Sequence, residues 1–254
     1  MKLSKKIIGL VAAILFTLPF LYLFLLSFAD EWRFPEFLPH SINIERWKDA
    51  IGSNNGIMNG FALSLVIAFF VALFSTLFGF FISRAIAHNK KRNLLLFSCY
   101  FPLSIAPVIY ALLVNYLFIR IGLSGTVAGI VIAQLMIAIP FGILLLNSFW
   151  NQQITALEEV SNTLGADFKE TFFKVLLPVA KPQLLVCFFQ TFLISWFEYG
   201  LTTIIGVCKI QTLTLKLYQY IGEANIYYAA TSSCIIIFPI IILLWINKKF
   251  IYSK

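Results

Sequence analysis

The residues with the most binding chemistry lie in one polar stretch, 154–182, within an otherwise apolar sequence. Apolar residues recur there at helical spacing from Ile154 to Leu164, with Glu158 and Glu159 on the opposite side. Thr155 and Glu158 have the spacing of a capping box, which predicts that the helix starts there. An amphipathic helix of this kind needs a cover for its apolar side, either a docked protein or the membrane surface.

The second half of the stretch predicts another short helix. Gly165 permits a tight turn because it has no side chain. Asp167 and Glu170 follow, at the helix start where the helix dipole favours negative charge. Glu170 also has the i,i+4 spacing for an ion pair with Lys174, and the prolines 178 and 182 indicate where the chain turns into the next segment. The stretch is therefore expected to form a helix–turn–helix.

Glu198 is the one ionisable residue inside a span that we expect to cross a membrane. A carboxylate in hydrocarbon is costly and usually faces a cavity or a partner. We interpret Glu198, Tyr199 and Gln134 as candidate residues of a translocation path, in which the carboxylate would favour a cationic solute. The alternatives are that Glu198 is hydrated near the membrane surface or bonds to a neighbouring helix, and that Gln134 forms a bond between helices.

Catalytic and metal-binding patterns are missing from the sequence. It has no phosphate-binding G-x-x-x-x-G-K-[ST] loop and no G-x-S-x-G nucleophile motif. Its two histidines, His40 and His88, have no second metal ligand close in sequence. The four cysteines are scattered and form no C-x-x-C pair, which is typical of small buried apolar residues. We expect no enzyme activity and no cofactor or metal bound by this chain.

The composition indicates an integral membrane protein. Hydrophobic residues make up 60% of the 254 and charged residues 12%, against about 25% charged in soluble domains. Long apolar runs are expected to cross the membrane as helices, since helices satisfy their own backbone hydrogen bonds. We expect one all-α membrane domain, 1–254, with six transmembrane helices at about 7–28, 60–83, 94–118, 126–149, 183–206 and 229–246. The first core, at 22 residues, is too long for a cleaved signal peptide.

Basic residues predict the orientation of these spans. With the N-terminus inside, thirteen of the nineteen Lys and Arg residues fall on inner segments. Six spans then place both termini in the cytoplasm, together with the helix–turn–helix at 154–182. The net charge of +8 is explained by this topology, so we expect no nucleic-acid partner.

The helix–turn–helix resembles the EAA motif of binding-protein-dependent ABC-transporter permeases. That motif reads E-A-A, three residues, G, nine residues and I-x-L-P; here the corresponding runs are Glu159-Val160-Ser161, Gly165 and Val175-Leu176-Leu177-Pro178. Glu159, Gly165, Leu177 and Pro178 match the motif identities. The segment around Pro102–Pro107 also resembles the subgroup that serves polyamines, ferric iron, thiamine, phosphonates, and sulfate or molybdate. The segment Trp196–Gly200 resembles the polyamine, thiamine and iron members.

The resemblance implies a MetI-like permease fold and half of the solute pathway of an ATP-driven importer in a bacterial cytoplasmic membrane. It implies three partners: an ABC ATPase dimer that holds the ATP, a second identical or paralogous permease, and an extracytoplasmic solute-binding protein. The residues that would couple to the ATPase are Glu158, Glu159, Gly165, Ala166, Leu177 and Pro178. The substrate would be a small solute such as a polyamine, thiamine, ferric iron or phosphonate. The alternative is an ATP-independent transporter or channel, which we would expect to show more intramembrane charge or an inverted repeat.

Overall fold

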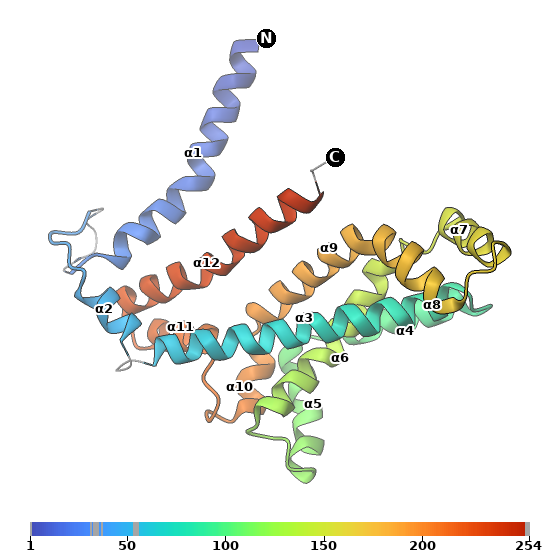
Figure 1. Ribbon diagram of the computed structural model, residues 1–254. Coiled ribbons are helices and arrows are strands. Elements are labelled where there is room, and N and C mark those ends of the chain that lie inside the picture. Colours follow the sequence, from blue (N-terminus) through green and yellow to red (C-terminus); the bar gives the residue numbers. More distant parts are fainter. Residues whose placement is uncertain (1, 31, 33–35, 37, 53–55, 252–254) are drawn as a thin grey trace. The chain divides into compact units, whose positions relative to one another are not determined.

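The computed structural model describes residues 2–30, 32, 36, 38–52 and 56–251. Within these residues the protein is helical, and the only strand-like pairing is an isolated bridge between Ala29 and Ile42. This confirms the expected all-α fold. The helices, drawn in Figure 1, are α1 Lys2–Ser27, α2 Glu45–Ile51, α3 Ile57–Ala87, α4 Arg92–Ser104, α5 Pro107–Arg120, α6 Val127–Leu146, α7 Gln152–Thr163, α8 Phe168–Glu170, the π-helical segment Thr171–Leu176, α9 Leu177–Trp196, α10 Gly200–Gly206, α11 Leu213–Gly222 and α12 Ile226–Ile251.

The chain forms two compact units. One takes in the described residues of Met1–Leu63 and Thr212–Ile241, and the other those of Ser64–Gln211 and Ile242–Lys254. In the first unit the short helix α2 packs on the end of α1, where the rings of Phe28 and Trp47 stack at 5.5 Å. The single membrane domain expected from the sequence stays a prediction.

Two glycines let helices α3 and α6 cross closely in the second unit. A Cβ atom on Gly79 would lie 3.1 Å from the backbone of Gly142, and one on Gly142 would lie 3.0 Å from the carbonyl oxygen of Ser75. Helix α6 also contacts α4, α9 and α10, so it lies at the centre of this unit.

Among the described residues, four helices are long and apolar enough to cross a membrane. They comprise α3, α6, the continuous helix Phe168–Trp196 and α12 over Ile226–Lys248, and they contain most of the expected spans 60–83, 126–149, 183–206 and 229–246. A fifth span would be the pair α4 and α5, bent by 95° within the expected span 94–118. The expected span 7–28 falls on α1, in which Ala13–Ser27 is an apolar helical stretch; a full span there stays a prediction.

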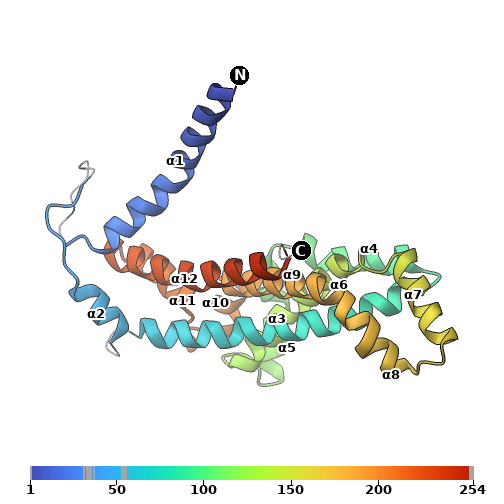
Figure 2. The same ribbon diagram turned by 45° about the horizontal axis from the view of Figure 1, so that its top comes forward.

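The chain does not turn at Pro178 and Pro182, and this expectation was wrong. One helix instead continues from Phe168 to Trp196 (Figure 2). Pro178 lies just after the π-helical segment Thr171–Leu176. In a regular α-helix the proline ring would clash with the carbonyl four residues earlier, and the wider π-helical turn makes room for it. The expected fifth span, 183–206, is also not continuous, because α9 ends at Trp196 and α10 begins at Gly200.

Candidate functional site

Helices α7 and α8 form a hairpin beside the C-terminal end of α3 in both views (Figure 1, Figure 2). Helix α7 begins earlier than the expected capping box. The Asn151 side chain caps it by accepting a hydrogen bond from the backbone N–H of Ile154 at 3.1 Å, and the Thr155 hydroxyl donates to the Asn151 carbonyl. The Thr155–Glu158 capping box was therefore wrong, because Asn151 is already extended and provides the cap.

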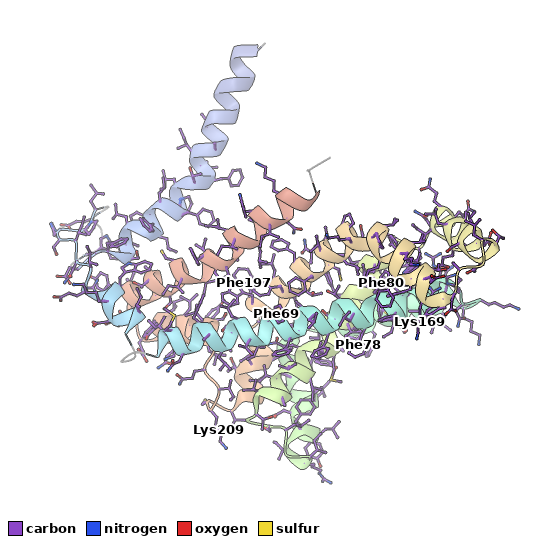
Figure 3. All side chains as sticks on the ribbon, viewed as in Figure 1. Phe69, Phe78, Phe80, Lys169, Phe197 and Lys209 are labelled. Atoms are coloured by element: carbon purple, nitrogen blue, oxygen red, sulfur yellow. The ribbon has the colours of Figure 1, made fainter. Side chains whose placement is uncertain are left out.

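The inner face of α7 consists of Ile154, Glu158 and Ser161, one residue per turn. Ile154 joins an apolar cluster that includes Phe80, Leu146, Trp150, Phe172 and Leu176; Phe80 lies on the part of α3 nearest the hairpin (Figure 3). The hydroxyl of Ser161 lies 2.9 Å from that of Thr171. Apolar packing thus holds the hairpin against α3, and a hydrogen bond joins α7 to the segment that follows α8.

Glu158 forms the charged contact of this inner face. Its Oε1 accepts a hydrogen bond from Nε of Arg84 at 3.1 Å, and its Oε2 lies 3.5 Å from Nε2 of His88. The Glu158 side chain is only 9% exposed, so its charge depends on these neighbours. Removing one partner of a buried ion pair leaves the other charge uncompensated, which typically costs about 3–5 kcal/mol.

The outer face of the hairpin carries the apolar stripe. Leu157 is 41% exposed, Val160 55%, Leu164 82% and Phe168 57%. Of the polar side expected from the sequence, Glu158 therefore faces the protein and Glu159 does not, and much of the apolar side is uncovered. Exposed apolar patches of this kind mark interaction surfaces.

The turn between the two helices is a Schellman motif. Gly165 has a φ of +81°, which only glycine adopts without strain. Its N–H donates to the carbonyl of Asn162, and the N–H of Ala166 donates to that of Ser161 at 3.2 Å. These two bonds satisfy carbonyls that the end of α7 leaves free.

Among the other expected coupling residues, Glu159 also lies on the hairpin. It is exposed and lines a polar pocket of about 730 Å³ with His88, Arg92 and Asn151. Leu177 and Pro178 do not belong to the hairpin; they begin α9, where Leu177 is half-buried and Pro178 is exposed. The structure thus groups Glu158, Glu159, Gly165 and Ala166 and places the last two motif residues on the helix that follows.

The ion pair expected between Glu170 and Lys174 is confirmed, with Nζ and Oε1 2.7 Å apart. Both side chains are exposed. Asp167 lies at the start of α8, as expected, and caps the helix by accepting a hydrogen bond from the Phe168 N–H.

The three expected path residues, Glu198, Tyr199 and Gln134, line one pocket of about 340 Å³. The Glu198 carboxylate accepts hydrogen bonds from the N–H groups of Leu201 and Thr202 at 2.6 and 2.9 Å and from the Thr202 hydroxyl at 2.7 Å. It therefore caps the first turn of α10, where the break after α9 exposes free backbone donors. This arrangement corresponds to the alternative in which Glu198 bonds to a neighbouring helix.

Sequence reasoning missed two hydroxyl residues that complete this network. Ser195 donates to the Gln134 side-chain oxygen, and the Gln134 nitrogen donates to Thr202 at 3.2 Å. Hydrogen bonds thus link α6, α9 and α10 in the order Ser195, Gln134, Thr202, Glu198. The signal in the sequence was the spacing of Thr202, four residues after Glu198.

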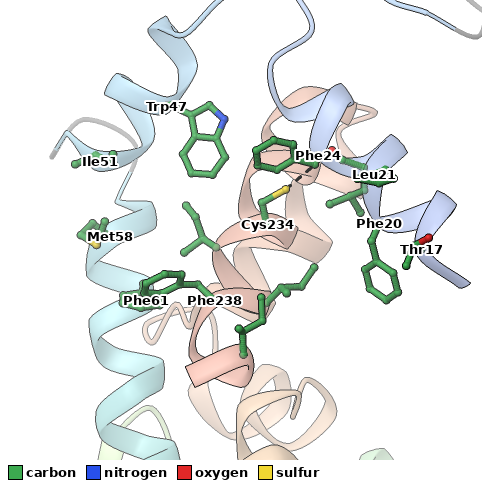
Figure 4. Close-up of a pocket in the computed structure, with 14 residues that line it drawn as sticks. Thr17, Phe20, Leu21, Phe24, Trp47, Ile51, Met58, Phe61, Cys234 and Phe238 are labelled. Atoms are coloured by element: carbon green, nitrogen blue, oxygen red, sulfur yellow. Dashed lines mark hydrogen bonds between the residues drawn. The ribbon is translucent and has the colours of Figure 1, made fainter. Parts of the chain in front are cut away.

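A larger pocket, of about 760 Å³, lies in the first unit and is almost wholly apolar. Its walls come from α1, α2, the start of α3, and α12, with Phe20, Phe24, Phe61 and Phe238 among the rings that line it (Figure 4). A polar solute would lose its hydration there without gaining hydrogen bonds. This pocket is therefore a poor site for an ion.

Over residues 75–251 the chain matches the family described as binding-protein-dependent transport system inner membrane components. It is 26% identical to a ferric transport system permease protein of Actinobacillus pleuropneumoniae, in a match that covers 73% of this chain and 31% of that protein. A sulfate transport system permease protein of Synechococcus elongatus is 28% identical, with 72% of this chain and 68% of that protein covered. A molybdenum transport system permease protein of Haemophilus influenzae is also 28% identical, with 74% and 92% covered.

The lengths of these relatives differ. The chain spans 31% and 20% of the two ferric permease proteins that it matches. Its fold resembles that in the crystal structure of a bacterial ABC transporter involved in the import of the acidic polysaccharide alginate. The TM-score is 0.66 at 20% identity, with 97% of both chains covered.

Proposed function

This chain belongs to the family of binding-protein-dependent transport system inner membrane components, and we propose that it forms half of the solute pathway of an ATP-driven importer. In this proposal a separate ABC ATPase dimer binds and hydrolyses the ATP. A second permease, identical or paralogous, completes the pathway, and an extracytoplasmic binding protein delivers the solute. The excess of basic residues on the inner segments supports a topology with both termini and the hairpin in the cytoplasm.

The uncovered apolar stripe on the hairpin carries this proposal. Leu157, Val160, Leu164 and Phe168 are all exposed, although the same hairpin is tightly packed on its other side. The stripe coincides with the segment that resembles the EAA motif. An apolar groove on the ATPase would bury these side chains and so bind the hairpin by its outer face.

For the substrate, we propose an inorganic ion of the kind named for the relatives: ferric iron, sulfate or molybdate. Glu198 gives little support to a cation preference, since its carboxylate is engaged by three hydrogen bonds from α10. The network of Gln134, Thr202 and Ser195 offers uncharged donors and acceptors in the same region. Selection by charge would then be made largely by the binding protein.

Affinity purification of the tagged chain from membranes in mild detergent tests the proposal. The expected result is that an ABC ATPase purifies with it, and that membrane vesicles take up a solute only when ATP and the binding protein are supplied. Competition with iron, sulfate and molybdate then assigns the ion. A chain that purified without an ATPase, even after crosslinking through Glu159, and that moved solute without ATP would contradict the proposal.

A further inference from the structure

Helix α3 and the hairpin lie far apart in the chain, yet one side chain of α3 touches both limbs of the hairpin. Arg84, in the last turn of α3, donates through Nε to Glu158 of α7, 74 residues away in sequence. The same guanidinium lies over the ring of Phe168 in α8, 4.8 Å from its centroid. We propose that Arg84 is a positioning residue that makes α3 follow the hairpin during transport. This proposal rests on the proposed function.

The covalent chain provides a link from the hairpin to only some of the spans. Helix α8 continues directly into α9 as Phe168–Trp196, and α6 leads into α7 through the short segment 147–151. Helix α3 has no such link, because α4, α5 and α6 intervene. Movement of a docked hairpin can therefore reach α3 only through non-covalent contacts, either directly or by way of α6.

Most of the contacts between α3 and the hairpin are apolar or involve a single hydrogen bond. Phe81 stacks on Phe172 at 5.5 Å, and the Trp150 indole donates to the Ser83 hydroxyl at 2.9 Å. Apolar attraction is non-directional, so stacked rings can slide past one another at small cost. A charge-assisted hydrogen bond fixes both distance and direction, and Arg84–Glu158 therefore sets the register between α3 and α7.

The environment of the pair makes separation unfavourable. The Arg84 side chain is 24% exposed and that of Glu158 is 9% exposed. Parting them would leave charges that are poorly hydrated, whereas an exposed pair separates freely. Glu170 and Lys174 form such an exposed pair on the same hairpin, and they provide a matched control.

The experiment reconstitutes the permease with its ATPase and binding protein in lipid vesicles and compares Arg84→Gln, Glu158→Gln and the control Glu170→Gln. We expect Arg84→Gln and the control Glu170→Gln to bind the ATPase and hydrolyse ATP as the natural sequence does. Because Glu158 itself belongs to the expected coupling residues, transport by Glu158→Gln is normalised to the ATP that this variant hydrolyses. In Arg84→Gln and Glu158→Gln the solute moved per ATP falls at least tenfold, while the control is unchanged. The exchange Arg84→Glu with Glu158→Arg recovers part of the loss. Natural-sequence protein that bound no ATPase would instead refute the proposed function.

A crosslink provides a second test that does not depend on the stability of the charge variants. Arg84→Cys and Glu158→Cys, in a chain whose native cysteines are replaced, are joined by a short thiol-reactive spacer. Loss of the ion pair should lower transport before crosslinking, and the crosslink should restore it, because α3 and the hairpin again move together. A crosslink that restores no transport, or an Arg84→Gln protein with unchanged solute per ATP, would overturn the proposal.

Discussion

Replacing Leu164 by alanine separates docking of the hairpin from its folding. Leu164 is 82% exposed at the end of α7, so its truncation should change the stability of the permease by no more than about 0.5 kcal/mol. If the stripe enters a groove on the ATPase, the leucine side chain becomes buried in the complex. Burial of a leucine contributes about 1.5–3 kcal/mol, and its loss would weaken binding roughly 10- to 150-fold.

The assay measures two quantities on the same purified protein: the Kd for the ATPase, by titration in detergent or nanodiscs, and the melting temperature of the permease alone. The matched control is Leu176→Ala. Leu176 is 1% exposed and packs in the apolar cluster beneath the hairpin. Its truncation leaves a cavity and should cost about 2–5 kcal/mol of stability. The two leucines should therefore give opposite patterns.

Two results would refute the reasoning. If Leu164→Ala bound the ATPase as tightly as the natural sequence, the stripe would not be the docking surface. If it instead lowered the melting temperature as much as Leu176→Ala, the side chain would be buried in the permease itself.

Three further substitutions test individual features of the fold. Gly165→Ala places a side chain at a φ of +81°. It should reduce the free energy of unfolding by about 1 kcal/mol or more, measured as a lower melting temperature. Gly165→Asn should reduce it less, because asparagine tolerates this conformation. Gly142→Ala brings a Cβ to 3.0 Å from the Ser75 carbonyl and should cost about 1–3 kcal/mol in denaturant unfolding; Gly222→Ala, where a Cβ meets nothing, is its control. Glu198→Ala removes the cap of α10 and should cost about 0.5–2 kcal/mol of thermal stability, more than Glu198→Gln.

The hairpin shows which features of this structure can be predicted from the sequence. The turn at Gly165, the position of Asp167 at a helix start and the pair Glu170–Lys174 were all expected, because each depends on residues within five positions of one another. The predicted start of α7 was wrong, because a contact between distant residues decides it. Asn151 and Thr155 both fit as caps. Trp150 is buried beside Phe80, and this contact fixes where the chain leaves the core, so that Asn151 provides the cap.

Contacts between distant segments could not be predicted in this way. The bend between α4 and α5 was indicated by Pro102 and Pro107, but its angle of 95° depends on how α5 packs against α10. The break at 197–199 has no proline or glycine inside it. It exists because Glu198 can cap α10 and because Gln134, in α6, accepts from Ser195 and donates to Thr202 on either side of the break.

The adjacent glutamates 158 and 159 illustrate this limit most clearly. In sequence they are equivalent, and the motif identity falls on Glu159. A helix turns by about 100° per residue, so one of the two must face the protein when the other faces away. The position of Arg84 decides which: Glu158 pairs with it inside, and Glu159 remains exposed beside the polar pocket. We therefore expect different tasks for the two side chains, Glu158 toward α3 and Glu159 toward the proposed ATPase. Neutralising Glu159 should mainly weaken ATPase binding, whereas neutralising Glu158 should mainly reduce the solute moved per ATP.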